Sequence, residues 1–295
     1  MTGFIVPGSP EWLRLITPSK VPAILGVSRF KSQFTLWHEM AGSVAPAPVS
    51  ERQQDDYDYG HAAEAAAAEY WKWKHAGWRL SRGEVQLRNP SLPFAHLATI
   101  DRRASRGRSR RVVEVKTARD LYEYGDDGSG EVPADYAAQV LTQQLISGWH
   151  DDADLVVWPQ YGMPRIYKVP FNEAVAAAIV ARCAAWVESL RAGTPPNLDD
   201  SITCYETVRA LHPDIDDVEI EIDEGLAVDY LELDARRKEI EAAARGAKTK
   251  VLDAMGRARV AVVGDVKVAD RRAGKHSIAL YPATKNLSQI QEHAA

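Results

Sequence analysis

The chain of 295 residues is long enough for one large domain, or for one domain with an appendage. Its formal net charge of -5 at pH 7 argues against a protein held on nucleic acid by overall charge alone, although a local basic surface is still allowed. Two cysteines cannot frame a disulfide scaffold, a four-cysteine zinc site or an iron–sulfur cluster, so we expect a reducing cytoplasmic setting. Neither a signal peptide nor an apolar run of about 18 residues is found, so no membrane association is expected.

The N-terminal quarter predicts helices. Short helical patterns cover residues 17–26 and 32–42, each with a Ser or Thr that can cap its start and a glycine that ends it. Residues 45–50, APAPVS, form a connector. The clearest helix is predicted over residues 59–76, because this stretch is rich in alanine, the residue with the highest helix propensity.

The middle of the chain predicts strands interleaved with two further helices. The strand patterns cover residues 84–88, 94–103, 110–118, 152–160 and 165–170, and the helices cover residues 133–147 and 171–193. Residues 104–109, ASRGRS, have the composition of a hairpin loop. This order predicts an α/β fold with a mixed central sheet flanked by helices.

The C-terminal part has a different character. A long charged helix is predicted from about residue 222, followed by a hairpin whose turn is Gly264–Asp265. We therefore predict a core domain over residues 1–210, a helix-plus-hairpin appendage over residues 222–282 and a loose tail over residues 283–295.

Residues 110–119, RRVVEVKTAR, place an acid and a base within an otherwise β-branched strand. Glu114 and Lys116 are two residues apart, so they project from the same face. Asp101 ends the preceding strand pattern, and a hairpin would bring it beside Glu114. Two adjacent carboxylates are costly unless a cation lies between them, and oxygen ligands of this kind suit Mg²⁺. A metal, a water nucleophile and a cation together indicate phosphodiester hydrolysis, although a surface ion pair is the simpler alternative for the strand alone.

Polar residues on two helices fit the same interpretation. Glu64 lies on the alanine-rich helix, whose small side chains would allow close packing against a sheet. Tyr136, Gln139 and Gln143 share one face of the helix over residues 133–147. In each case the alternative is ordinary exposure to solvent.

Six arginines lie between residues 102 and 111, immediately after Asp101. On a hairpin tip, side chains such as Arg102 and Arg103 would contact phosphate backbones through charge and paired hydrogen bonds. A solvated loop is the alternative explanation.

Several motifs in order resemble the YqaJ-type viral recombinases, relatives of phage lambda exonuclease within the PD-(D/E)XK nuclease superfamily. The resemblance covers roughly residues 10 to 200. The stretches that carry it are TPSKVPAILGVSRFKSQFTLWHEMAG (17–42), YGHAAEAAAAEYW (59–71), LATIDRR (97–103), VVEVKTA (112–118), VPADYAAQVLTQQLISGWHDDADLVVW (132–158) and GTPPNLDDS (193–201).

The resemblance implies a restriction-endonuclease-like core and a set of site residues. Asp101 and Glu114 would be metal-binding acids, with the carbonyl of Val115 as a further ligand. Lys116 would be the catalytic lysine, with Glu64 and Gln139 as additional catalytic residues and Glu64 near the metal. The residues expected at DNA or its terminal phosphate are Ser19, Thr99, Arg14, Arg102 and Arg103, where the spacing around Arg14 departs from the family pattern.

The implied activity is a Mg²⁺-dependent exonuclease, with Mn²⁺ as a substitute, that digests one strand of duplex DNA from its end in the 5′ to 3′ direction. The implied partners are double-stranded DNA ends and a phage single-strand annealing protein, in a bacterial host cell, with a trimeric ring as the expected assembly. The alternative is a catalytically inactive module that binds DNA ends or a protein. A Cas4-like enzyme would need four cysteines, and a fused ATP-driven motor would need a phosphate loop that this sequence lacks.

Overall fold

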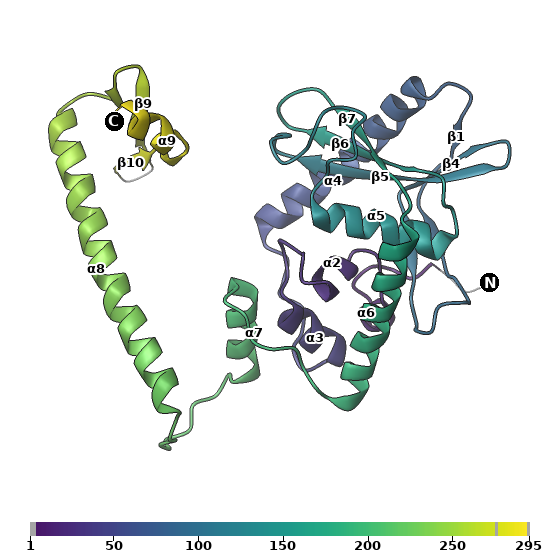
Figure 1. The fold of residues 1–295 in the computed structure, drawn as a ribbon, viewed down its shortest axis with the longest axis horizontal. Helices are drawn as coiled ribbons and strands as arrows, with labels where there is room; N and C mark the ends of the chain where they lie inside the picture. Colours follow the sequence, from purple (N-terminus) through teal and green to yellow (C-terminus); the bar gives the residue numbers. More distant parts are fainter. Residues whose placement is uncertain (1–3, 275–276, 294–295) are drawn as a thin grey trace. The chain divides into compact units, whose positions relative to one another are not determined.

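The computed structural model describes residues 4–274 and 277–293 (Figure 1). Its contacts divide the chain into two compact units, Met1–Ile215 and Asp216–Ala295. Among the described residues, no helix combines the length and the apolar character needed to cross a membrane.

The first unit begins with four helices, α1 (Pro10–Arg14), α2 (Val21–Ile24), α3 (Gln33–Ala41) and α4 (Glu51–Lys74). The predicted caps of α3 are confirmed, since the Ser32 side chain accepts a hydrogen bond from Thr35 N and Gly42 ends the helix with a φ of 76°. The helix α2 is shorter than predicted, because Thr17 and Ser19 pair with each other at 3.1 Å in the turn that precedes it.

The helix α4 starts eight residues before its predicted beginning at residue 59. Ser50, which the sequence placed in a connector, caps it by accepting a hydrogen bond from Gln53 N, and the Gln53 side chain accepts one from Ser50 N in return. This capping box satisfies two backbone N–H donors. It thereby stabilises the polar first half of α4, whose residues have low helix propensity.

The central sheet has five strands in the order β1-β4-β5-β6-β7. Their bounds are β1 (Arg79–Leu80), β4 (Arg102–Arg106), β5 (Ser109–Ala118), β6 (Ala153–Pro159) and β7 (Arg165–Val169), while β2 (Val85–Leu87) and β3 (Ala98–Ile100) form a separate pair. Strands β5 and β6 are parallel, and the other neighbours are antiparallel, so the predicted mixed sheet is confirmed.

The hairpin between β4 and β5 is tighter than the sequence predicted. Residues 104–106 continue strand β4, and only Gly107 and Arg108 form the turn. Gly107 has a φ of 59°, a conformation that costs glycine nothing. The expected loop ASRGRS is therefore mostly strand.

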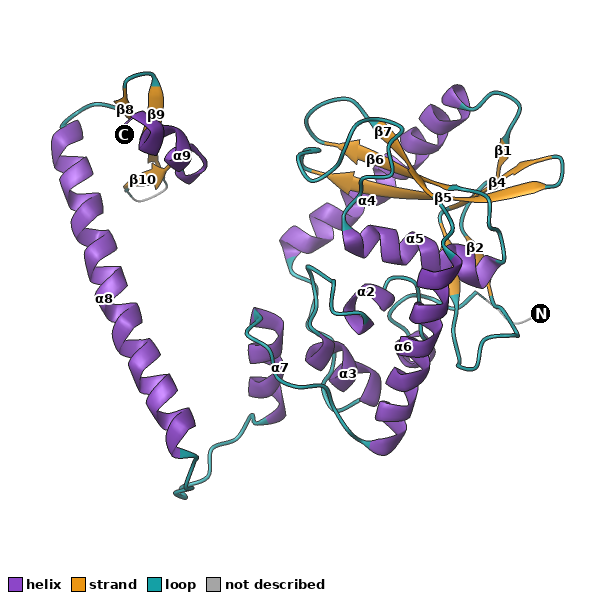
Figure 2. Cartoon of the chain, in the orientation of Figure 1, coloured by secondary structure: helices purple, strands orange, loops and turns teal. Residues whose placement is uncertain are grey.

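Helices cover both faces of this sheet (Figure 2). One face packs on α5 (Ala134–Ser147), with Val112, Val140 and Leu155 among the buried residues. The other face packs on α4, where Val113 meets Trp71. The alternation along β5 explains this division, because neighbouring strand residues point to opposite faces.

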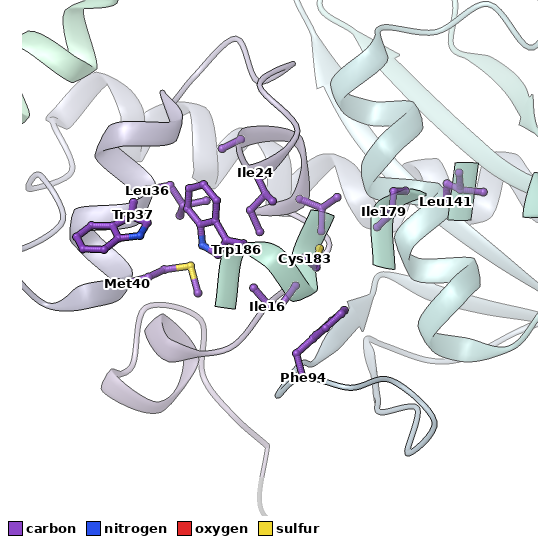
Figure 3. Packing of buried hydrophobic residues seen from close by; sticks show 12 residues of the cluster. Ile16, Ile24, Leu36, Trp37, Met40, Phe94, Leu141, Ile179, Cys183 and Trp186 are labelled. Carbon is purple, nitrogen blue, oxygen red and sulfur yellow. The ribbon is translucent and has the colours of Figure 1, made fainter. Parts of the chain in front are cut away.

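A separate apolar core joins the N-terminal helices to α6 (Glu173–Ala192). Figure 3 shows Ile24, Leu36 and Trp37 facing Cys183 and Trp186 across this core. The short helix α7 (Ile202–Leu211), which the sequence did not predict, docks on α3 through a hydrogen-bonded pair of buried threonines, Thr35 and Thr207, at 2.8 Å.

The second unit consists of α8 (Glu224–Met255), a three-stranded sheet and short helical turns. The sheet contains β8 (Val260–Val263), β9 (Val266–Ala273) and β10 (Ile278–Pro282), followed by η1 (Thr284–Asn286) and α9 (Leu287–His293). The predicted hairpin turn at Gly264–Asp265 is confirmed. The expected loose tail instead carries η1 and α9, where Asn286 Nδ2 donates to Lys267 O at 2.9 Å; residues 294–295 lie outside the described part.

Candidate active site

Strand pairing brings Asp101, Glu114 and Lys116 together as the sequence predicted. Arg102 lies opposite Val113 in the β4–β5 ladder, so Asp101, just before β4, falls beside Glu114. Asp101 Oδ2 accepts a hydrogen bond from Val115 N at 2.8 Å, and Lys116 Nζ donates to Glu114 Oε1 at 2.6 Å.

The helix α5 holds Glu114 from the other side. Gln139 Nε2 donates to Glu114 Oε1 at 2.6 Å, and Gln143 Nε2 donates to Glu114 Oε2 at 2.6 Å. Glu114 is 2% exposed and Gln143 is fully buried, so the polar stripe of α5 faces the sheet and not solvent. Each carboxylate oxygen of Glu114 therefore has at least one fixed donor.

The Asp101 carboxyl group is costly to ionise. Burial, followed by repulsion from Glu114, raises the pKa of Asp101 well above its usual value. Burial alone would lower the pKa of Lys116, but attraction by Glu114 and Asp101 raises it above that of a free lysine. Lys116 therefore keeps its positive charge beside Asp101, a carboxyl group that is hard to ionise in this setting.

Glu64, on α4, is a third acidic residue near Asp101 and Glu114. Its carboxylate lies 3.6 Å from Arg102 Nη1, and burial, outweighing the attraction of Arg102, raises its pKa. It interacts electrostatically with both Asp101 and Glu114. Glu64 thus faces the same region, although its closest charged partner is the arginine.

The donor set fits a hard divalent cation better than any other group. The available ligands are the oxygens of Asp101 and Glu114, and carboxylate oxygens are what Mg²⁺ and Mn²⁺ prefer. Burial, followed by repulsion from Glu114, raises the pKa of Asp101, and a bound cation would favour its ionised form. With the side chains as they stand, no three His, Cys, Asp or Glu residues within 4–274 and 277–293 are arranged to hold a metal. An ion at this place would be held by Asp101 and Glu114, with Glu64 nearby.

Comparison with known proteins gives a family resemblance for the part of the chain that holds these residues. Residues 11–150 match the model of the YqaJ-like viral recombinase domain. This segment is therefore similar to the YqaJ-like viral recombinase domain. The matched YqaJ-like segment contains Glu64, Asp101, Glu114, Lys116 and Gln139, and the resemblance drawn from the sequence motifs is confirmed.

One curated relative of the YqaJ-like segment is the "Uncharacterized protein YqaJ" of Bacillus subtilis (strain 168), 32% identical over 136 residues. The alignment covers 44% of this chain and 40% of the relative, so the chain spans less than half the length of that protein. Among solved structures, the alkaline exonuclease LHK-Exo from Laribacter hongkongensis is similar with a TM-score of 0.47 and 14% identity, covering 68% of this chain and 96% of that chain. The complex of LHK-Exo with dAMP gives the same TM-score at 16% identity, with the same coverage.

Three of the residues expected at DNA lie in the YqaJ-like segment outside the carboxylate cluster. Ser19 is exposed, and its hydroxyl pairs with that of Thr17. Thr99 Oγ1 accepts from Gln86 Nε2 at 3.2 Å, while its main-chain oxygen accepts from Gln143. Arg14 is exposed in the last turn of α1. None of the three forms a hydrogen bond or ion pair with Asp101 or Glu114 within the described residues.

The arginines between residues 102 and 111 do not form one tip cluster. The strand alternation sends Arg111 to the α4 face, where it donates to the fully buried Asp154 at 3.0 Å and stacks over Trp78. Arg102 is held near Glu64, and Arg103, also on β4, is exposed. The side chains of this hairpin are divided between the two faces, because neighbouring strand residues point to opposite sides of a sheet. Contact between these arginines and DNA stays a prediction.

Two contacts of the YqaJ-like segment were not predicted from the sequence. Gln143 was recognised only as part of a polar stripe, although its four-residue spacing from Gln139 places both amides on the face that reaches Glu114. Tyr136 lies between two cations, with Lys116 Nζ 5.6 Å and Arg29 Cζ 5.1 Å from its ring centre. Arg29 in turn pairs with the buried Asp135, which fixes the start of α5.

Gln143→Leu is expected to lower any DNA cleavage about 10- to 100-fold, because outer partners that orient a metal ligand typically contribute this much. Gln144→Leu is the matched control: Gln144 is equally buried but donates to the carbonyls of Asp151 and Val169. Both variants remove a buried amide, so both are expected to lose stability in thermal unfolding. Equal cleavage rates for the two variants would contradict a role for Gln143 in holding Glu114.

Proposed function

We propose that this protein is a metal-dependent exonuclease that hydrolyses DNA phosphodiester bonds from duplex ends in the 5′ to 3′ direction. The observation that carries the proposal is the pair of carboxylates, Asp101 and Glu114, beside the charged Lys116 at one end of β5. The family description, a viral recombinase domain, supports DNA as the substrate. The product would be a single strand available to a phage annealing protein.

In this proposal Asp101 and Glu114, with the carbonyl of Val115, hold Mg²⁺ or Mn²⁺. When bound, such an ion supplies a water of lowered pKa and offsets charge on the phosphate. Gln139 and Gln143 keep the Glu114 carboxylate in one orientation. Preorganisation of this kind avoids the cost of reorienting a ligand during the reaction.

Lys116 supplies positive charge in this proposal. Its pKa is raised by Glu114 and Asp101 against the effect of burial, so it does not act as a neutral base. Its ammonium instead stabilises the negative charge that builds on the phosphate oxygens when the bond breaks. Glu64 is the third acid near the ion in this proposal, and Arg102 offsets part of its charge.

The remaining predicted contacts are assigned to the DNA. Ser19, Thr99 and Arg14 would bind the terminal phosphate, and the exposed Ser19 hydroxyl has room for such a contact. Arg102 and Arg103, at the start of β4 next to Asp101, would bind the backbone. A trimeric ring would keep the enzyme on the duplex between successive cuts.

The proposal is tested with a linear duplex that carries a label at one 5′ or one 3′ end, incubated with Mg²⁺ or with EDTA. Early release of the 5′ label, no release with EDTA and no cut in a covalently closed circle are the expected results. Early release of the 3′ label would overturn the polarity, and cutting of the circle would overturn the requirement for an end. Binding of duplex ends without cleavage under Mg²⁺ or Mn²⁺ would indicate the inactive module instead.

A further inference from the structure

The helix α8 is long and almost unburied. It runs for 32 residues, and its residues up to Lys250 are exposed or half-buried. Its last turn packs within its own unit, where Met255, Val251 and Leu252 belong to one cluster with Ala269 and Leu280 of the sheet. Most helices in proteins owe their stability to the packing of an apolar face. Within the described residues of its own unit, α8 has no buried residue before Met255.

Large apolar side chains recur along α8 at coiled-coil spacing. Leu226, Tyr230, Leu233 and Ile240 are 60%, 71%, 62% and 68% exposed, and they are separated by four, three and seven residues. These are the a and d positions of a heptad pattern. The pattern continues through the small residues Ala244 and Ala247. We call this row, residues 226, 230, 233, 237, 240, 244 and 247, the α8 seam.

The one charged member of the α8 seam is neutralised on its own helix. Arg237 Nη2 lies 2.7 Å from Asp234, and its Nη1 lies 2.7 Å from Glu241. A long side chain held in this way can turn its charged end outward while its aliphatic part covers the seam. Arg237 therefore interrupts the apolar row without placing an unpaired charge in it.

The two halves of α8 differ in both charge and side-chain size. Residues 224–241 carry six acidic and three basic residues, whereas residues 242–255 carry three basic and one acidic residue. The first half of the seam holds large apolar side chains, and the second half holds alanines. Two such helices side by side are complementary when they run in opposite directions.

We propose that α8 pairs with α8 of a second copy of this chain in an antiparallel coiled coil along the α8 seam. This orientation sets the acidic half of one helix against the basic half of the other. It also lets Ile240 pack against Ala244 of the partner subunit, a large side chain against a small one. A parallel pair would instead place like charges together and stack Arg237 on the same residue of the second copy.

The pairing is tested with the full chain by multi-angle light scattering. The seam variant, Leu233→Glu with Ile240→Glu, is expected to have half the mass of the wild type. The matched control, Val228→Glu with Leu231→Glu, changes two apolar residues that are 46% and 66% exposed but lie off the seam, and it is expected to keep the wild-type mass. Equal masses for all three proteins, or a monomeric wild type, would overturn the proposal, as would a seam variant that loses thermal stability at unchanged mass.

The orientation is tested separately by disulfide cross-linking, which requires no disruptive substitution. Ala243→Cys, beside the centre of the antiparallel pair, is expected to link two copies under mild oxidation. Leu226→Cys is expected to give no such link, because antiparallel helices of this length separate those positions by roughly 40 Å. The native Cys183 and Cys204 are buried and give a low background. Linking through residue 226 and not through residue 243 would overturn the antiparallel arrangement.

Discussion

Lys116→Met is expected to reduce the rate of DNA hydrolysis about 1000-fold, the loss typical of removing one preorganised group that stabilises transition-state charge. Methionine retains much of the volume of the lysine stem but carries no charge. The substitution also leaves Glu114 and Asp101 without the cation that stands beside them, so their mutual repulsion rises. The initial rate of label release from a linear duplex measures the effect.

The matched control for this prediction is Lys168→Met. Lys168, on β7, also pairs with a buried carboxylate, that of Asp154, but this pair lies on the α4 face of the sheet. Both variants remove one lysine from a partly buried ion pair, so a general loss of stability would affect both. Retention of more than about a tenth of wild-type activity by Lys116→Met would contradict its assignment, because a merely structural lysine costs stability and not turnover.

The sequence predicted the centre of the candidate site because strand geometry is local. The two-residue period places Glu114 and Lys116 on one face, and a hairpin brings Asp101 alongside, so no knowledge of the rest of the fold was needed. The hydrogen bond from Gln143 to Glu114 could not be predicted in the same way. It depends on which face of α5 packs against the sheet, and that choice is made by long-range packing of Val140 and Leu155.

The errors in the sequence prediction have equally specific causes. The first two turns of α4 are polar and lack apolar periodicity. The sequence signal for the start of this helix is the capping box formed by Ser50 and Gln53. Arg106 and Arg108 were assigned to a loop because ASRGRS has loop composition, yet strand pairing extends to Arg106 and Ser109. A turn centred on Gly107 would have divided these side chains between the two faces from the start.

The carboxylates on the two faces of the sheet differ in the number of cations beside them. Asp154, on the α4 face, is fully buried but receives hydrogen bonds from Trp71, Arg111 and Lys168. Its charge is therefore matched by more than one cation. On the α5 face, Asp101 and Glu114 share a single lysine. Asp154 therefore has more positive charge beside it than Asp101 and Glu114 have. A pair of carboxylates with too few neighbouring cations favours the binding of a metal ion.

Asp101→Asn is therefore expected to have effects of opposite sign on activity and on stability. Hydrolysis should fall about 1000-fold, because an amide cannot replace a carboxylate as a metal ligand. The free energy of unfolding, measured in EDTA, should rise by about 1 kcal/mol near pH 8. Asparagine can still accept the hydrogen bond from Val115 N, and it removes the repulsion between Asp101 and Glu114.

The stability difference should depend on pH in a defined direction. The folded protein raises the pKa of Asp101, mainly through burial and then through Glu114, so it binds this proton more tightly than the unfolded chain does. The wild type consequently loses stability as the pH rises above the unfolded value, about 4, through the folded pKa, and the asparagine variant does not. The gap between the two melting temperatures should therefore close at acid pH and open toward pH 8. A variant that is less stable than the wild type at pH 8 in EDTA would show that Asp101 is a structural carboxylate, satisfied by its hydrogen bond to Val115, and not half of a strained pair awaiting a cation.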